Sequence, residues 1–89
     1  MPTPQPTWTP PTEPNETRSQ LPDSAFAFPS LRREPLLDAA HVRNALSRFD
    51  QVKDASDEER ALAFENILAA ASYFGVHVSE KSWRDLMHG

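Results

Sequence analysis

The chain contains no cysteine, only two glycines and no long hydrophobic run. Without cysteine there is no disulfide framework and no thiolate chemistry, which fits a reducing compartment. Two glycines are too few for a glycine-rich phosphate-binding loop. No apolar run approaches the ~20 residues that a membrane-spanning helix needs, and the N-terminus lacks the basic-then-apolar layout of a signal peptide. These absences predict a cytoplasmic protein with no membrane segment.

Positively charged residues are also fewer than negatively charged ones. The 89 residues carry nine Lys and Arg against thirteen Asp and Glu, a net charge of −4. A mildly acidic domain repels polyanions at long range, which argues against nucleic acid and acidic membranes as partners.

Proline is concentrated at the N-terminus, because residues 1–20 contain six of the nine prolines. Trp8 is the only large apolar side chain in this range other than Met1, so the segment has little surface to bury against the entropy of ordering. We therefore predict a disordered tail over residues 1–20 and no effect on stability when residues 1–18 are deleted. Alternatively, Pro11 to Pro14 fits the minimal P-x-x-P pattern of ligands for proline-binding grooves.

The next segment, residues 21–37, is too apolar for a free linker but contains three prolines that forbid a continuous helix. Phe26-Ala27-Phe28 alternates as a short extended piece does. We expect an irregular arm laid across the helices, with both phenylalanine rings in the core.

Three helices are expected after the arm, at about 39–51, 57–74 and 80–87. Asp38 is placed to cap the first helix, and the apolar residues of that helix recur at helical spacing through Phe49. Ser56 and Glu59 form the pattern of a capping box before the second helix, and Gly75 is placed to end it. The last, short helix follows Ser79.

The expected architecture is therefore an all-α, three-helix domain with an N-terminal arm packed on it and a disordered proline-rich tail. The tail takes residues 1–20 and the domain residues 21–89, divided into the arm at 21–37 and the helical part at 38–89.

The second helix has two apolar sides. Leu62, Ala69 and Tyr73 lie nearly opposite the stripe that faces the core, at 100° per residue. A second apolar face of this kind has to be covered by the arm, the C-terminus or another molecule. It is the first candidate interaction surface.

A second candidate surface consists of polar side chains on the arm and the first helix that the expected fold does not use. Its residues are Arg32, Arg33, His41, Arg43, Asn44 and Arg48. If the arm crosses the first helix, the arginines converge, and a three-helix unit with such a surface is compatible with nucleic-acid binding. The other interpretation of these arginines is a solvated face paired with neighbouring carboxylates.

No residue pattern indicates catalysis or a bound cofactor. The histidines at 41, 77 and 88 have neither an HxxxH nor an HExxH spacing, and no nucleophile elbow or paired-carboxylate setting is present. We expect no enzyme activity, no metal and no cofactor.

The stretch LPDSAFAFPSLRREPLLDAAHVRNALSRFDQ, residues 21–51, resembles a small uncharacterised bacterial domain with the signature LPDSxFAFP…PLxDAxHVRNALxRFxQ. The resemblance extends through residues 56–83 and implies relatives in actinobacterial and phage proteins, some of them associated with capsid-maturation proteases. It implies no activity. Taken together, the sequence favours a non-enzymatic module for protein–protein contacts or an accessory of a larger assembly, with nucleic-acid binding as the alternative.

Overall fold

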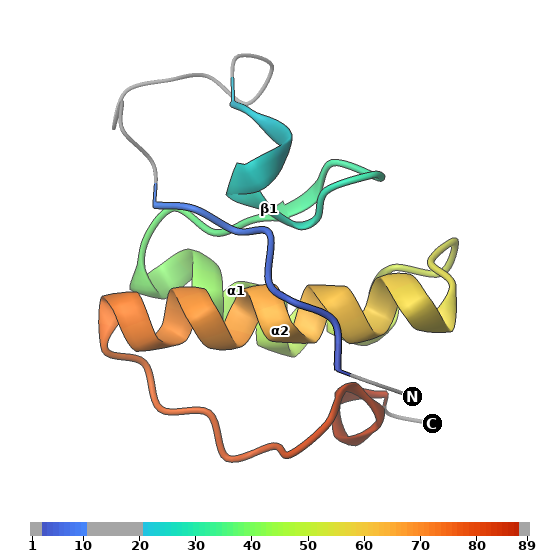
Figure 1. Ribbon diagram of the computed structural model, residues 1–89. Helices are drawn as coiled ribbons and strands as arrows, with labels where there is room; N and C mark the ends of the chain where they lie inside the picture. Colours follow the sequence, from blue (N-terminus) through green and yellow to red (C-terminus); the bar gives the residue numbers. More distant parts are fainter. Residues whose placement is uncertain (1–2, 11–20, 88–89) are drawn as a thin grey trace.

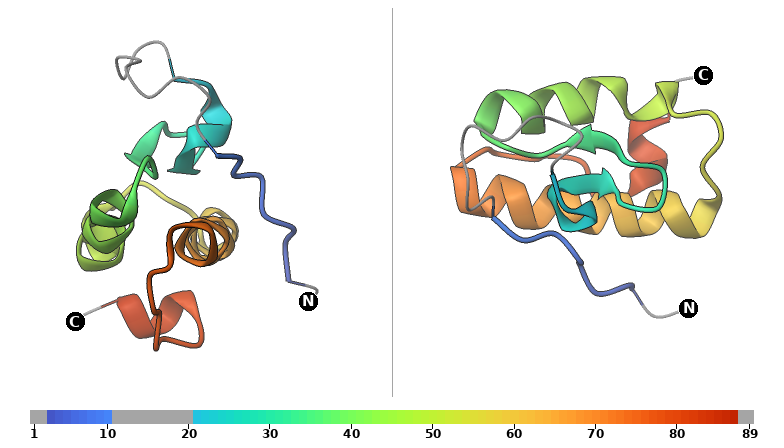
Figure 2. Two further views of the ribbon diagram at one scale, coloured as in Figure 1. Left: turned by 90° about the vertical axis from the view of Figure 1, so that its left-hand side faces the viewer. Right: turned by 90° about the horizontal axis from the view of Figure 1, so that it is seen from above.

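Two antiparallel helices and a short β-hairpin make up the centre of the molecule, as seen in a computed structural model that describes residues 3–10 and 21–87. The helices are α1 (Ala39–Arg48) and α2 (Asp57–Phe74). Strands β1 (Phe26–Phe28) and β2 (Arg33–Pro35) pair in antiparallel register, with Phe26 opposite Pro35 and Phe28 opposite Arg33. The hairpin lies on one side of the helix pair and the C-terminal segment on the other (Figures 1 and 2).

Helix α2 begins and ends where its sequence signals predict. The Ser56 hydroxyl accepts a hydrogen bond from the Glu59 amide at 3.1 Å, and the Glu59 carboxylate accepts from the Ser56 amide at 2.8 Å. At the other end, Gly75 has a φ of 73° and donates its amide to the Ala71 carbonyl. This left-handed conformation is inexpensive only for glycine, so the helix stops there.

Helix α1 is held at its start by Asp38. The carboxylate of this residue accepts from the His41 amide at 2.8 Å. This bond and the neighbouring His41 ring hold the pKa of Asp38 below its ordinary value. The α-helix ends at Arg48 and continues as a 3₁₀ turn over Phe49–Gln51, so the first predicted helix is present with a tightened last turn.

The main core fills the space between the helices and the hairpin. Phe28 of β1 and Phe49 after α1 meet there with ring centroids 5.3 Å apart, and each is at most 1% exposed. The largest fully buried side chains are Phe26, Phe28, Phe49, Leu36, Ile67, Val42, Val52 and Asn66. The prediction that both arm phenylalanines are buried is confirmed.

The prediction of an all-α, three-helix domain is wrong. The arm contains the hairpin β1–β2, and the last predicted helix, 80–87, is only a 3₁₀ turn over Trp83–Leu86. The Asp85 carboxylate explains the short turn, because it accepts from the amides of Lys81 (3.0 Å) and Ser82 (3.3 Å). The residue before the helical turn is therefore Ser82 rather than Ser79, and the turn contains only the four residues Trp83–Leu86.

The prediction of a disordered N-terminal tail is also wrong for residues 3–10, which the structure describes. They form an extended segment that runs alongside α2 (Figures 1 and 2), and Trp8 is part of the main core with 8% exposure. Residues 1–2 and 11–20, including the P-x-x-P pattern at Pro11 to Pro14, lie outside the described residues.

Phe49→Ala is expected to lower the free energy of unfolding by about 3–5 kcal/mol, because it leaves a cavity against Phe28 in a small core. Denaturant unfolding measures this loss. The matched control is Arg48→Ala on the exposed side of α1, which is expected to stay within ~0.5 kcal/mol of wild type. A midpoint for Phe49→Ala near that of the control contradicts the burial of the ring.

Glu59 links the hairpin loop to α2, because its carboxylate also accepts from the Ser30 hydroxyl at 2.7 Å. This bond, followed by those from Ser56, holds the pKa of Glu59 below its ordinary value of 4.5. Since the folded pKa is depressed, the stability that ionised Glu59 contributes is complete above pH 4.5 and is lost as the pH falls through the folded value.

Ser30→Ala is therefore expected to raise the pKa of Glu59 toward its ordinary value. An NMR titration of the side-chain carboxyl carbon measures the change. Ser47→Ala, which removes a hydroxyl from the exposed face of α1, serves as the control and is expected to leave this pKa unchanged. An identical Glu59 titration in Ser30→Ala and wild type contradicts the loop contact.

Candidate functional site

A fully buried asparagine, Asn66 in the middle of α2, holds the N-terminal segment to the rest of the structure. Its Oδ1 accepts from the backbone amides of Thr7 (2.7 Å) and Trp8 (2.9 Å). Its Nδ2 donates to the Thr7 hydroxyl (3.2 Å) and to the Ala27 carbonyl in β1 (2.9 Å). An asparagine side chain can accept two bonds and donate two, so every capacity of Asn66 is used.

Trp8 is the anchor of the segment. Its indole N–H donates to the Leu36 carbonyl at 3.1 Å, just beyond β2. Its ring lies edge-on to Tyr73 and Phe74, at centroid distances of 5.7 and 5.8 Å. Burial of the ring together with a satisfied indole N–H is the arrangement that tryptophan needs in a core.

The segment is fixed beyond Trp8 as well. The Thr9 amide donates to the Ser24 carbonyl at 3.1 Å, and the Thr9 hydroxyl bonds the Ser24 hydroxyl at 3.0 Å. Asn66, Leu36 and Ser24 therefore belong to three different parts of the chain and contact one short segment. We call the place formed by these residues and the rings of Tyr73 and Phe74 the segment groove.

The second apolar face of α2 is partly covered by this segment. Leu62 and Ala69 are half-buried, whereas Tyr73 is 62% exposed. Within the described part of the chain, Tyr73 is the one large hydrophobic residue that is exposed. Tyr73 reaches Trp8 on one side and Phe74 on the other, the latter at 4.9 Å between centroids. It therefore forms the solvent edge of an aromatic cluster.

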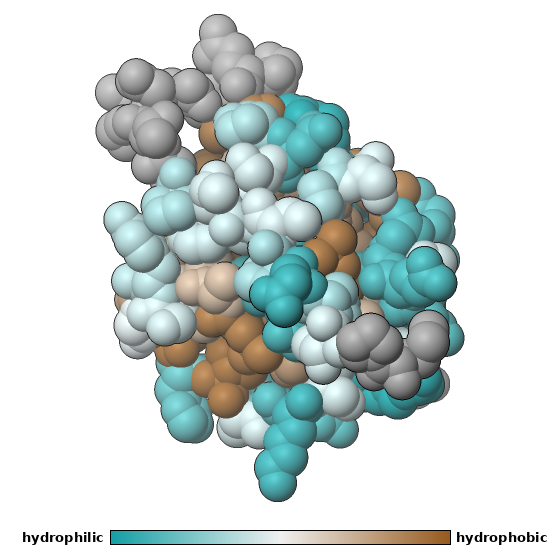
Figure 3. Space-filling view, viewed as in Figure 1, coloured by the Kyte–Doolittle hydropathy of each residue, from teal (hydrophilic) through white to brown (hydrophobic). Residues whose placement is uncertain are grey.

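Hydrophobic surface continues beside this part of α2. On the face drawn in Figure 3, it gathers over the second half of the helix and the segment that follows. Half-buried apolar residues from this region are Ala69, Phe74, Val76 and Val78.

A hollow of about 270 Å³ lies at the other end of the segment. Thr3 and Pro4 form one wall, the first half of α2 forms another, and Trp83 closes the third. Opposite charges, Glu65 and Lys81, stand among its lining residues. The N-terminal segment thus runs along α2 from this hollow to the aromatic cluster.

Of the predicted polar surface, Arg32 is engaged within the fold. Its guanidinium bonds the Asp23 carboxylate at 2.6 Å and the Leu21 carbonyl at 2.7 Å, and it lies 4.7 Å from the centre of the Phe26 ring. These contacts hold Arg32, whose φ is +51°, against the outer side of the hairpin. It contributes to packing there.

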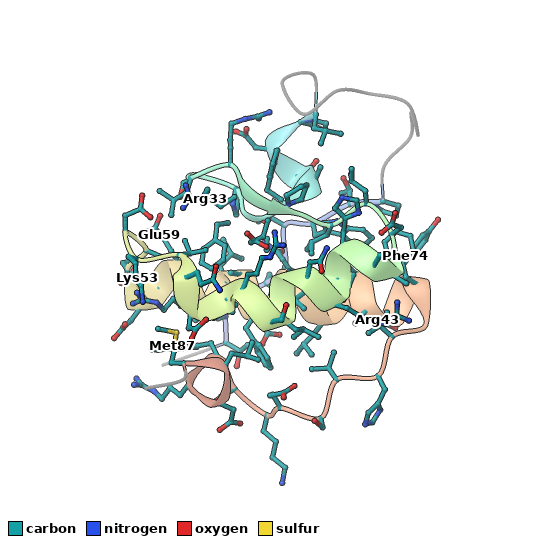
Figure 4. The ribbon with its side chains drawn as sticks, turned by 180° about the vertical axis from the view of Figure 1, so that it is seen from behind. Arg33, Arg43, Lys53, Glu59, Phe74 and Met87 are labelled. Carbon is teal, nitrogen blue, oxygen red and sulfur yellow. The ribbon has the colours of Figure 1, made fainter. Side chains whose placement is uncertain are left out.

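Two of the remaining arginines of the predicted surface, Arg33 and Arg43, do not lie together. Arg33, Arg43, Asn44 and Arg48 are all exposed. Viewed from behind, Arg33 on the hairpin and Arg43 on α1 lie at opposite sides of the molecule (Figure 4). Asn44 and Arg48 are on α1 with Arg43.

His41 takes part in capping α1. Its Nδ1 lies 2.8 Å from the Asp38 carboxylate, in addition to the amide bond described above. Across residues 3–10 and 21–87, no group of three or more His, Asp or Glu side chains is arranged to hold a metal ion. Nor does any helix in that part of the chain have the length and apolar character to cross a membrane. His88 lies outside the described residues.

Sequence reasoning did not single out Asn66. A signal was present, because Asn66 falls in the middle of the second apolar face of α2, four residues after Leu62 and three before Ala69. A polar residue in such a stripe has to find hydrogen-bond partners, and these must come from elsewhere in the chain.

The fold and the segment groove define a small mixed domain built around two helices and a hairpin, with the N-terminal segment packed on it. Residues 11–81 match the model of DUF6582, described as a family of unknown function, and the chain belongs to that family. Neither the curated proteins nor the solved structures contain a match to this chain.

Asn66→Ala is expected to lower the free energy of unfolding by about 2–4 kcal/mol, because the amides of Thr7 and Trp8 lose their acceptor while buried. Chemical denaturation monitored by circular dichroism measures the loss. Asn44→Ala makes the same change on the exposed face of α1, and its effect is expected to stay within ~0.5 kcal/mol. Equal stability of the two variants contradicts the described network.

Trp8→Ala is expected to cost about 3–5 kcal/mol through the cavity between Leu36 and Phe74. The same reasoning overturns the expectation that residues 1–18 are dispensable, since a truncated chain loses Trp8 and leaves Asn66 without its segment. Truncation at residue 18 with unchanged thermal stability is the result that contradicts this.

Proposed function

We propose that this protein is a non-enzymatic interaction module that contacts another protein through the face along α2, as an accessory to a larger assembly. The observation that carries the proposal is Tyr73, which is 62% exposed while its ring packs edge-on against Trp8 and Phe74. Tyrosine held rigidly at a surface is a favoured anchor of protein interfaces, because it gives contact area at little entropic cost.

The surroundings of Tyr73 support this proposal. Tyr73 belongs to the second half of α2, over which hydrophobic surface gathers (Figure 3), and the hollow beside Trp83 lies at the other end of the N-terminal segment. A partner covering both ends would bury aromatic and apolar groups and would meet two opposite charges, Glu65 and Lys81, at the hollow. That is a hydrophobic centre with polar groups at its border.

The finer parts of the proposal rest on the sequence. A cytoplasmic location is proposed because the sequence contains no cysteine, which fits a reducing compartment. A setting in actinobacterial or phage assemblies follows from the resemblance of residues 21–51 described above. The absence of catalysis follows from the lack of a nucleophile or paired-carboxylate motif.

Nucleic-acid binding has less support. Arg43, Asn44 and Arg48 offer an exposed polar face on α1, but Arg32 is engaged with Asp23 and Leu21. The net charge of −4 opposes the electrostatic attraction on which such binding depends. Gel-shift titrations at low salt are expected to detect no complex, and a salt-dependent complex weakened by Arg43→Ala would favour this alternative instead.

Photo-crosslinking in the native host tests the proposed face. A photoreactive phenylalanine analogue in place of Tyr73 is expected to give a discrete protein adduct, identified by mass spectrometry and competed away by unlabelled wild type. The same analogue in place of Arg43, on exposed α1, is the matched control and is expected to give none. Equal adducts at both positions, or none at either, contradict the proposal.

A further inference from the structure

The contacts of the segment groove are concentrated on a short part of residues 3–10. Among residues 3–10, only Trp8 is buried, Pro4 is half-buried and the others are exposed. The groove contacts three consecutive residues, through the amides of Thr7, Trp8 and Thr9, both threonine hydroxyls and the indole N–H. What it contacts is therefore a Thr-Trp-Thr stretch on extended backbone, which the neighbouring prolines favour.

The groove and the segment are separate along the chain. The residues that contact the segment run from Ser24 to Phe74 and lie inside residues 11–81, the range matched to the family, whereas residues 3–10 precede that range. The packing of α1, α2 and β1 on one another includes Phe28, Phe49, Val42 and Ile67, which lie outside the groove. Everything needed to bind the motif therefore belongs to the part of the chain that the family shares.

The groove is also reachable from solvent with the segment in place. Tyr73 forms one wall at 5.7 Å from Trp8 and is 62% exposed. Thr7 and Thr9, on either side of the anchor, are exposed as well. A competing chain can therefore begin to replace the segment at its edges before Trp8 leaves.

We propose that the segment groove is a docking site for an extended, proline-flanked Thr-Trp-Thr segment of a partner protein, and that residues 3–10 are a tethered competitor for it. The inference rests on the proposed interaction function and names the chemistry of the partner. The occupant seen in the structure supports it, because every polar contact described above is one that the same motif makes from another chain.

The tether sets how strongly the chain's own segment competes. Ten residues, 11–20, join it to the rest of the chain. A segment joined to its own binding site by a short linker competes at an effective concentration on the order of 1 mM. A free peptide with a Kd of about 10 μM for the empty groove then binds wild type about 100-fold more weakly.

The test uses a fluorescein-labelled peptide with the sequence of residues 3–10, TPQPTWTP, and the full chain carrying Trp8→Ala. Saturable binding is expected from fluorescence anisotropy, together with a rise in the melting temperature of the variant. Wild type is expected to bind at least tenfold more weakly. A peptide with alanine in place of tryptophan, and the double variant Trp8→Ala/Asn66→Ala, are expected not to bind, whereas Trp8→Ala/Asn44→Ala retains binding.

A second measurement covers the case in which Trp8→Ala does not fold. A protease site placed within residues 11–20 of the otherwise wild-type chain is cleaved after folding, and labelled peptide is added. Exchange of the cleaved segment for labelled peptide, with the far-UV circular dichroism retained, supports the proposal. Unfolding on loss of the segment, or no exchange, makes residues 3–10 a permanent part of the core and overturns it.

Two further outcomes separate the possibilities. A wild-type dimer that is lost in Trp8→Ala assigns the groove to a second copy of this chain and overturns the partner proposal. Failure of peptide binding to a folded Trp8→Ala variant also overturns it. The crosslinking result at Tyr73 is independent of both, so the proposed function is judged separately.

Discussion

The hydrogen bonds of Asn66 with Thr7, Trp8 and Ala27 are the interaction on which the arrangement of this small domain depends. They join α2 to the N-terminal segment, 58 residues away along the chain, and to Ala27 in β1. A buried amide is costly unless it is fully paired, and this one has two amide donors for its oxygen and two acceptors for its nitrogen. An aliphatic side chain at this position would leave the amides of Thr7 and Trp8 without an acceptor.

The same contact explains how a short chain assembles a sufficient core. Small domains bury a low fraction of their surface and are correspondingly marginal. Here Trp8 is added to the core from the proline-rich segment, with its indole N–H satisfied by Leu36. The segment thus has a structural role through Trp8. In our proposal, the exposed threonines beside Trp8 and the exposed edge of Tyr73 allow a partner segment to replace it in the segment groove.

The sequence predicted what local signals determine. The capping box at Ser56 and Glu59 and the left-handed Gly75 specify α2 within a few residues of each end. The sequence did not predict the hairpin. The hairpin has positive φ at Arg32 and Glu34, and neither position holds a glycine, which is the usual sequence signal of this conformation. Of the candidate residues, Tyr73 lies at the site. Arg32 instead bonds Asp23 and Leu21, and these contacts could not be predicted from the sequence. The docking of Trp8 depends on partners far along the chain, which no local pattern specifies.

Amide hydrogen exchange at Thr7 and Trp8 in the wild-type protein tests the central claim most directly. If Asn66 accepts from both amides in solution, they exchange at least ~100-fold more slowly than in an unstructured peptide, and at rates comparable to each other. The Asn66 side-chain amide is then slowed as well. Exchange of Thr7 and Trp8 at unstructured-peptide rates would contradict the account, because the segment would then not be held by the buried asparagine.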